Sequence, residues 1–281
     1  MDSPAVELPR PPAAPASMRP AAGVRLVRML QPFFANRLLG TLSILGGLAI
    51  WEFVGRVIVN NALFLASPSQ IARAIVTLTA DGELGHHVAV SGLEFVLGYS
   101  IACVLGVVLG VAMGESLTLK RLLDPWVAGI YATPVIALAP LFILWFGIGI
   151  WSKVVVVVSL VLFPVTINTE AGLQRKSERL AEMLRSFGAT RRQIFWKLSL
   201  PSAMPFIMTG LKLGIGRGLI GVVVAELFGA RAGLGFLISE SAAVFNMPDL
   251  FAAIVVLAAA GILMTAGFNW LESRLVPWTT D

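Results

Sequence analysis

Four charged side chains stand inside long apolar runs of this sequence, where charge is costly and usually serves a function. They are Glu94, Lys212, Arg217 and Glu226. Lys212 lies near the end of its run and can extend its amine toward water. Arg217 lies near the middle, so its guanidinium either pairs with Glu94 or stabilises an anion in passage. We favour the ion pair, because an unpaired buried arginine is costly to maintain.

Other groups that could do chemistry are few. The two histidines, His86 and His87, are adjacent, so on a helix they point about 100° apart and make a poor metal pair. We interpret them as polar residues at the edge of an apolar run. The single cysteine, Cys103, excludes an intrachain disulfide and a cysteine-based metal site. An intramembrane serine protease needs a base at membrane depth, which these histidines do not provide.

The sequence contains no nucleotide-binding motif in a suitable setting. Residues 216–221 match the pattern GxGxxG, but they follow no predicted strand and lie inside an apolar run, so we reject a dinucleotide site. The pattern GxxxxGK[ST] does not occur in the sequence. We therefore expect no cofactor in this chain, and if it takes part in ATP-driven transport, the ATP binds to a partner subunit.

The composition indicates a membrane protein. Hydrophobic residues make up 57% of the 281 and charged residues 13%, whereas soluble domains average about 25% charged residues. A spanning helix needs roughly 20 mostly apolar residues. We predict an all-α bundle, because the runs are continuously apolar rather than alternating. Its six predicted spans are Leu38–Val59, Val88–Gly114, Trp126–Gly147, Val154–Ile167, Phe206–Phe228 and Leu250–Leu271, the fourth needing a few flanking residues to reach full length.

The positions of Lys and Arg predict the orientation. If the N-terminus is cytoplasmic, 15 of the 21 basic residues fall on the inner side, and only Arg56, Arg73, Lys153 and Arg231 on the outer side. Both termini are then inside. The net charge of +5 reflects this topology, so we expect no nucleic-acid partner.

From these spans and the loops between them we predict five parts of the chain. Residues 1–36 form a proline-rich cytoplasmic tail, 37–60 the first span, and 61–85 an outer loop. In that loop Ser67 and Pro68 are typical of the start of a helix lying at the membrane surface. Residues 86–272 form the core, which includes a charged loop at 170–204, and 273–281 form a cytoplasmic tail.

Glycines and prolines predict how the spans pack and bend. Two rows of glycines at four-residue spacing allow close helix contacts within the chain or across a dimer; they are Gly106, Gly110 and Gly114, and Gly210, Gly214 and Gly218. Asp124 and Pro125 suit the start of the third span. Prolines inside the third and fourth spans predict bends that line a pathway or only shape the packing. These prolines are Pro134, Pro140 and Pro164.

The loop at 170–204 is charged and amphipathic. Leu173, Leu180, Leu184 and Phe187 form an apolar stripe beside a charged face. Gly188 suits a helix end, and Thr190 with Gln193 forms a capping box that starts a second helix. We expect Pro201 and Pro205 to end that helix before the fifth span. The sequence predicts a helix, a tight turn and a helix, exposed for a partner to dock.

This loop resembles the EAA loop of type-1 inner-membrane permeases of ABC importers. Glu182, Gly188 and the pair Leu200–Pro201 stand at the spacing of that loop, although Met183–Leu184 replace its usual alanines. Residues 65–70 resemble a stretch that precedes the core domain in this family, and 134–147 resemble a run typical of its nitrate, sulfonate and taurine branch. Residues 224–226 and 233–235 continue the match. The resemblance covers about 64–278.

The resemblance implies a permease without catalytic activity in the inner membrane of a bacterium. Its partners would be two ABC ATPase subunits, a periplasmic solute-binding protein and a second permease copy. The residues implied in ATPase coupling are Glu182, Phe187, Gly188, Ala189, Thr190, Arg191, Leu200 and Pro201, and the candidate pathway residues are Glu94, Arg217 and Glu226. The solute would resemble nitrate, a sulfonate or taurine. Alternatives are a pyrimidine or vitamin precursor, or an ion-coupled transporter, although we find no internal repeat of the kind typical of the latter.

Overall fold

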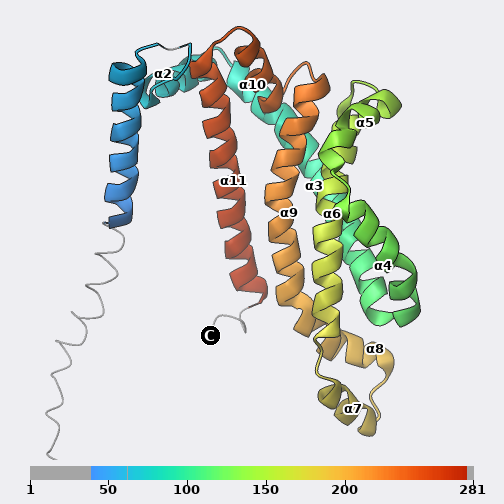
Figure 1. Ribbon diagram of the computed structural model, residues 1–281. Helices are drawn as coiled ribbons and strands as arrows, with labels where there is room; N and C mark the ends of the chain where they lie inside the picture. Colours follow the sequence, from blue (N-terminus) through green and yellow to red (C-terminus); the bar gives the residue numbers. More distant parts are fainter. Residues whose placement is uncertain (1–38, 62, 277–281) are drawn as a thin grey trace, which may run out of the picture. The chain divides into compact units, whose positions relative to one another are not determined.

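The computed structural model describes residues 39–61 and 63–276 (Figure 1). Every regular element among them is helical, which confirms the predicted fold class. Five described helices are long and apolar enough to cross a membrane, and a bent helix pair provides a sixth span. The chain divides into two compact units between Trp51 and Glu52, within the first span, Leu39–Val59. The expected tail at 1–36 lies outside the described residues.

The second unit contains the core. Its helices are α2 (Pro68–Ala80), α3 (Glu83–Glu115), α4 (Leu117–Ala132), α5 (Ala139–Phe146), α6 (Ile150–Gln174), α7 (Glu178–Ser186), α8 (Arg191–Ile194), α9 (Leu200–Gly229), α10 (Leu234–Ala243) and α11 (Met247–Leu275). Short π-helical turns cover Val54–Val59 and Phe195–Ser199, and a 3₁₀ turn covers Val135–Leu138. Because α11 runs to Leu275, it includes the first residues of the expected tail at 273–281.

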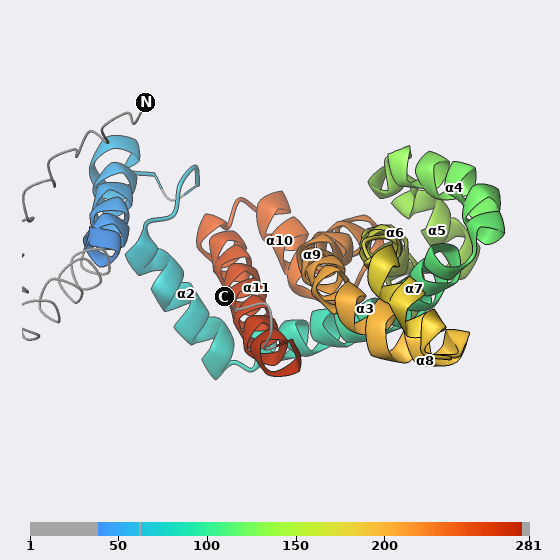
Figure 2. The same ribbon diagram turned by 90° about the horizontal axis from the view of Figure 1, so that it is seen from below.

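Helix α6 is the centre of the bundle and packs against both α3 and α9 (Figure 1, Figure 2). It is the span with the shortest uncharged stretch, and it extends beyond Val154–Ile167 at both ends. Val157, Val161 and Val165 are fully buried along it. The many valines of α6 suit a helix between two others, because their side chains present apolar surface both to α3 and to α9.

Both predicted glycine rows contact α6 within the chain. A Cβ atom added at Gly106 would lie 2.8 Å from the Val165 side chain, and one at Gly110 would lie 2.6 Å from the backbone oxygen of Thr166. On the other side, a Cβ added at Gly214 would lie 2.9 Å from Val161. Small residues therefore let both neighbours approach α6 closely, as packing without a hydrophobic driving force requires.

The third span is broken in two rather than continuous. Helix α4 begins after Ser116, whose hydroxyl accepts the Leu119 N–H bond at 3.3 Å, so Asp124 and Pro125 lie inside the helix and the predicted start there was wrong. The chain then bends by 78° between α4 and the segment 135–146. Pro134 explains this break, because a proline disfavours a helical conformation in the residue before it, and Thr133 is extended. Pro140 begins α5 instead of interrupting a helix.

The prediction that Pro201 and Pro205 separate a short helix from the fifth span was also wrong. Helix α8 continues through the π-turn at 195–199 into α9, and residues 191–229 form one long helix. The wider π-turn ends at Ser199, two residues before Pro201, which occupies the first turn of α9. The wider ring of a π-turn accommodates a local change in the hydrogen-bond ladder, so the helix continues through the proline.

Helix α2 forms where the sequence predicts it. The Ser67 N–H donates to the Gln70 side chain at 2.9 Å as half of a capping box, and Pro68 opens the helix. Its buried residues are Ile71, Ala74 and Leu78, and α2 packs against α11. The apolar side of this helix is therefore used for packing inside the second unit.

Candidate functional site

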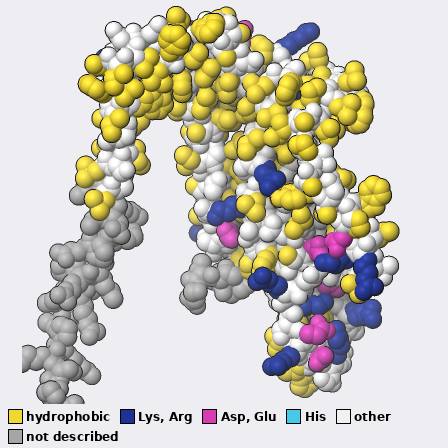
Figure 3. Space-filling view, viewed as in Figure 1, with side chains coloured by type: hydrophobic (Ala, Val, Ile, Leu, Met, Phe, Trp, Pro, Cys, Tyr) yellow, Lys and Arg dark blue, Asp and Glu magenta, His cyan; other side chains and the backbone are white. Residues whose placement is uncertain are grey.

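A helical elbow, formed by residues 177–199, lies at the N-terminal end of α9, whereas α10 follows the other end (Figure 1). It contains α7, a tight turn, α8 and the π-turn. Charged side chains gather over this elbow and the neighbouring α4, whereas hydrophobic side chains dominate the opposite end in the same view (Figure 3). The elbow is thus a polar projection from an otherwise apolar bundle.

The turn of the elbow is a Schellman motif centred on Gly188. The Ala189 N–H donates to the Leu184 carbonyl at 2.9 Å, and the Gly188 N–H donates to the Arg185 carbonyl at 2.9 Å. These two bonds define the motif and satisfy the last carbonyls of α7. Gly188 has a φ of +82°, in the left-handed region that disfavours residues with a side chain. The prediction that this glycine ends the first helix is confirmed.

The second helix starts with the predicted capping box. The Thr190 N–H donates to the Gln193 side chain at 2.8 Å, and the Gln193 N–H donates to the Thr190 hydroxyl at 3.3 Å. Ile194 is buried, and Phe195 packs against a cluster that includes Leu173. The second half of the elbow is therefore fixed to the bundle.

Only part of the apolar stripe predicted for the first helix packs against this chain. Leu173 belongs to the end of α6, where it is fully buried. Three other apolar residues of the elbow's first half are exposed, Phe187 at 82%, Met183 at 49% and Leu180 at 45%, whereas Leu184 is half-buried. Ala181 is the one buried residue of α7. An apolar face left open at a polar site is typical of a protein interaction surface.

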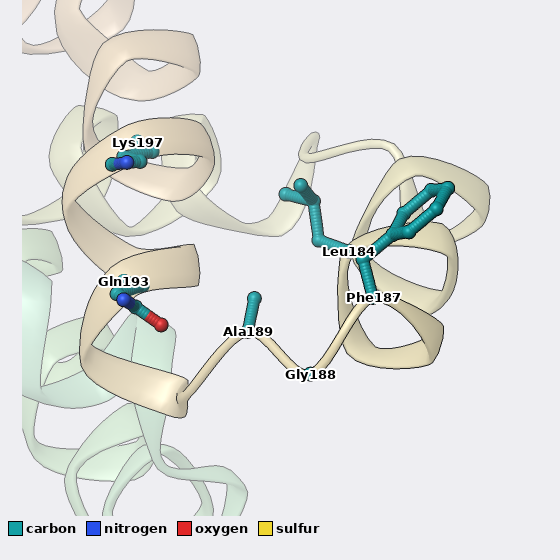
Figure 4. A pocket seen from close by; sticks show the side chains of 6 residues that line it. All are labelled: Leu184, Phe187, Gly188, Ala189, Gln193 and Lys197. Carbon is teal, nitrogen blue, oxygen red and sulfur yellow. The ribbon is translucent and has the colours of Figure 1, made fainter.

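A cleft of about 230 Å³ lies between the two halves of the elbow. Leu184 and Phe187 come from the α7 side, Gln193 and Lys197 from the opposite helix, and Gly188 with Ala189 connects them (Figure 4). Of the predicted coupling residues, Glu182, Phe187, Gly188, Thr190 and Arg191 are exposed, whereas Ala189, Leu200 and Pro201 are half-buried. The structure therefore offers five of these eight residues to a partner.

Of the three predicted pathway residues, Glu94 and Glu226 lie together, whereas Arg217 contacts Tyr131 instead. Glu226 is fully buried and holds the start of α10, because its two carboxylate oxygens accept from the Ser91 hydroxyl and the Gly235 N–H, each at 2.6 Å. Glu94 is buried beside Glu226, and its Oε2 atom has no hydrogen-bond partner among the described residues. This cluster fastens the chain between α9 and α10 to α3.

His87 and Lys153 also belong to this cluster, and the burial of His87 differs from its expected place at the edge of an apolar run. His87 is buried, and its Nδ1 atom accepts the Gly233 N–H at 2.9 Å. Lys153, which we placed on the outer side, is buried near both glutamates. A signal for the cluster existed in the sequence, since His87, Ser91 and Glu94 recur at four- and three-residue spacing and so share one face of α3.

Arg217 does not pair with Glu94, so the interpretation we favoured was wrong. Its guanidinium donates to the Tyr131 hydroxyl at 2.9 Å and lies 5.2 Å from the centre of the Tyr131 ring. Within residues 39–61 and 63–276, no carboxylate oxygen lies within 4.0 Å of it. Among the described residues, the partner of this arginine is therefore Tyr131, an aromatic alcohol of α4.

The sequence also matches a known family model. Residues 102–280 match the binding-protein-dependent transport system inner membrane component, a segment that contains the elbow and both ends of α9. The chain belongs to this family. It is a type-1 ABC importer permease for small solutes and a multi-pass protein of the inner membrane.

Three curated relatives are similar to this permease over most of its length. The formylaminopyrimidine transport permease protein ThiX of Halalkalibacterium halodurans is 37% identical over 85% of this chain and 94% of its own length. The taurine transport system permease protein TauC of Escherichia coli is 34% identical over 85% and 88%. The putative aliphatic sulfonates transport permease protein SsuC of Bacillus subtilis is 33% identical over 82% and 84%. The solutes in these names differ in chemistry, so the relatives establish the class of protein but not its cargo.

Proposed function

We propose that this chain forms, with a second copy of itself, the membrane pore of an importer in which a separate ATPase binds the elbow. ATP hydrolysis takes place on that ATPase, and a solute-binding protein delivers the solute at the end of the bundle that carries α10. Movement of the ATPase subunits is transmitted through the elbow into α9, and the bundle alternates between two states.

The exposed Phe187 is the observation that supports this proposal best. An aromatic side chain that is 82% exposed, on a helix with an uncovered apolar face, gains much by entering a pocket of a partner. Buried aromatic anchors carry a large share of the binding energy at protein interfaces. The charged residues around it, including Glu182 and Arg191, suit the polar rim of such an interface.

The distribution of charge supports a cytoplasmic position for the elbow. Residues 175–197 carry seven Lys and Arg residues, and basic loops are retained on the cytoplasmic side of membranes. The elbow precedes α9 and α10 comes after it, and α9 is long enough to span the bilayer. The elbow and α10 therefore lie at opposite ends of this helix. With the elbow inside, α10 lies on the outer side, where a solute-binding protein can reach it.

For the solute we propose a sulfonate- or taurine-like compound, on the similarity to TauC and SsuC. A pyrimidine precursor is the second candidate, because ThiX has the higher identity at 37%. A sulfonate- or taurine-like compound is distinguished by its sulfonate group, which is an anion at neutral pH.

Replacing Phe187 by alanine tests the docking proposal. We expect Phe187→Ala to weaken association with the ATPase subunit of the transporter by about 30-fold, because an aromatic anchor contributes about 2 kcal/mol or more. Co-purification in detergent and surface plasmon resonance measure the change. Trp270→Ala, an exposed aromatic side chain of α11 outside the elbow, is the matched control and should bind normally. Equal affinity of the Phe187 variant and the wild type contradicts the proposal.

A further inference from the structure

Arg217 is placed where a free positive charge is most expensive. Helix α9 ends at Gly229, 12 residues later, so the Cα atom of Arg217 lies about 18 Å from that end at a rise of 1.5 Å per residue. The apolar part of a bilayer is about 30 Å thick, which puts the residue near mid-depth. Its side chain is exposed in the single chain. A charge at this depth faces water or another polar group rather than lipid.

The break in the third span creates a pocket beside this arginine. The pocket has a volume of about 200 Å³, and its lining includes Tyr131, Thr133, Pro134, Ser159, Phe163 and Arg217. Thr133 and Pro134 contribute because α4 ends there and the chain turns by 78°. The Tyr131 ring lies 6.5 Å from the Phe163 ring, so it is held between α6 and the guanidinium.

The hydrogen-bonding groups of the pocket are suited to an anion. An arginine has five N–H donors, and the structure gives Arg217 one acceptor among the described residues, the Tyr131 oxygen. Because that oxygen accepts from Arg217, its own proton is left to donate to a bound group. The hydroxyls of Thr133 and Ser159 donate to backbone carbonyls of their own helices at 2.9 and 2.8 Å. Both groups are uncharged, so they do not neutralise the charge of Arg217.

The nearby carboxylates do not neutralise this charge. Glu226 is bound to Ser91 and Gly235, and Glu94 lies beside Glu226 with Lys153 close to both. The positive charge of the Arg217 pocket therefore has no counter-ion among the described residues. A planar guanidinium fork matches the paired oxygens of a carboxylate or sulfonate, which it binds through two parallel hydrogen bonds.

We propose that this pocket holds the anionic group of the solute as it crosses the membrane, and that the solute is therefore a small organic oxyanion. The inference rests on the proposed function, because it requires a solute pathway along this face of α9. It assigns part of the selection of solute to the permease itself, through Arg217 and Tyr131. It also favours a sulfonate over a neutral pyrimidine precursor.

The test uses the complete transporter in proteoliposomes, with its ATPase and binding protein. We expect Arg217→Gln to reduce ATP-driven uptake of taurine or ethanesulfonate at least 10-fold, and Arg217→Lys, which keeps the charge but loses the fork, to reduce it less. Lys212→Gln, another exposed cation of α9, is the matched control and should transport within twofold of the wild type. In all variants the loaded binding protein should still stimulate ATP hydrolysis.

Three results would overturn the inference. One is uptake by Arg217→Gln at the wild-type rate. Another is loss of ATPase co-purification in both Arg217 variants, which assigns the residue to assembly. The third is a solute without an anionic group on the binding protein, identified by mass spectrometry, with uptake otherwise normal. Failure of the wild-type complex to transport anything in an ATP-dependent manner is distinct from these, because it contradicts the proposed function on which the inference rests.

Discussion

Replacing Gly188 by valine should reduce ATP-driven uptake at least 10-fold without unfolding the bundle. At a φ of +82°, an ordinary L residue costs about 1–2 kcal/mol, and a β-branched one costs more. A Cβ atom at this position would meet nothing within 4 Å, so the effect comes from the backbone and not from a clash. The turn would open, and α7 would present Phe187 in another direction. Uptake in proteoliposomes and co-purification of the ATPase measure the loss.

Asparagine at position 188 distinguishes a requirement for the left-handed backbone conformation from a requirement for a small residue. Asparagine adopts the left-handed conformation more easily than other residues with a side chain, so Gly188→Asn should keep most of the activity. The thermal midpoint of the purified chain should be similar for both variants, because the turn is exposed. Normal transport by the valine variant contradicts the role that we give to the turn.

The second large effect is expected at the contact between α3 and α6. In Gly110→Ala the added Cβ atom would lie 2.6 Å from the backbone oxygen of Thr166 and 2.6 Å from Cβ of Thr169. Neither can rotate away, so the two helices must separate, at a cost of about 1–3 kcal/mol that is typical of overpacking. We expect the thermal midpoint in detergent to fall by several degrees, which circular dichroism or a thiol-reactive dye at Cys103 can follow.

Gly92 is the matched control on the same helix. Its added Cβ atom would meet nothing within 4 Å, and alanine is favoured over glycine inside a helix by about 1 kcal/mol. Gly92→Ala should therefore leave the midpoint unchanged or raise it. Equal midpoints for the two alanine variants would show that the close approach at Gly110 does not limit stability.

The spans were predictable from sequence because each depends on a local run of apolar residues. The same rules located Ser67, Gly188 and the Thr190–Gln193 box, since helix caps are formed by residues close in the chain. They failed at Pro201 because the π-turn before it allows the helix to continue. The position of α6 in the centre was also not predictable, since hydropathy does not tell which neighbour a helix meets.

Errors in the candidate site came from side chains that meet across helices. Arg217 and Glu94 were expected to pair because both are charged and lie in apolar runs, but the fold places a tyrosine beside one and a glutamate beside the other. An exposed elbow was expected from the sequence, but not which of its apolar side chains would be exposed. An apolar stripe on an amphipathic helix is ordinarily buried against its own domain, and the fold shows that Phe187 is 82% exposed.

Uptake by proteoliposomes of defined composition tests most directly the claim that this chain conducts solute under the control of a separate ATPase. The purified chain should accumulate no solute alone, and accumulation should require the ATPase, ATP and the loaded binding protein together. Within the complete system, omission of any one component should abolish uptake. Accumulation of solute by the chain alone, with only an ion gradient across the membrane, would contradict the account.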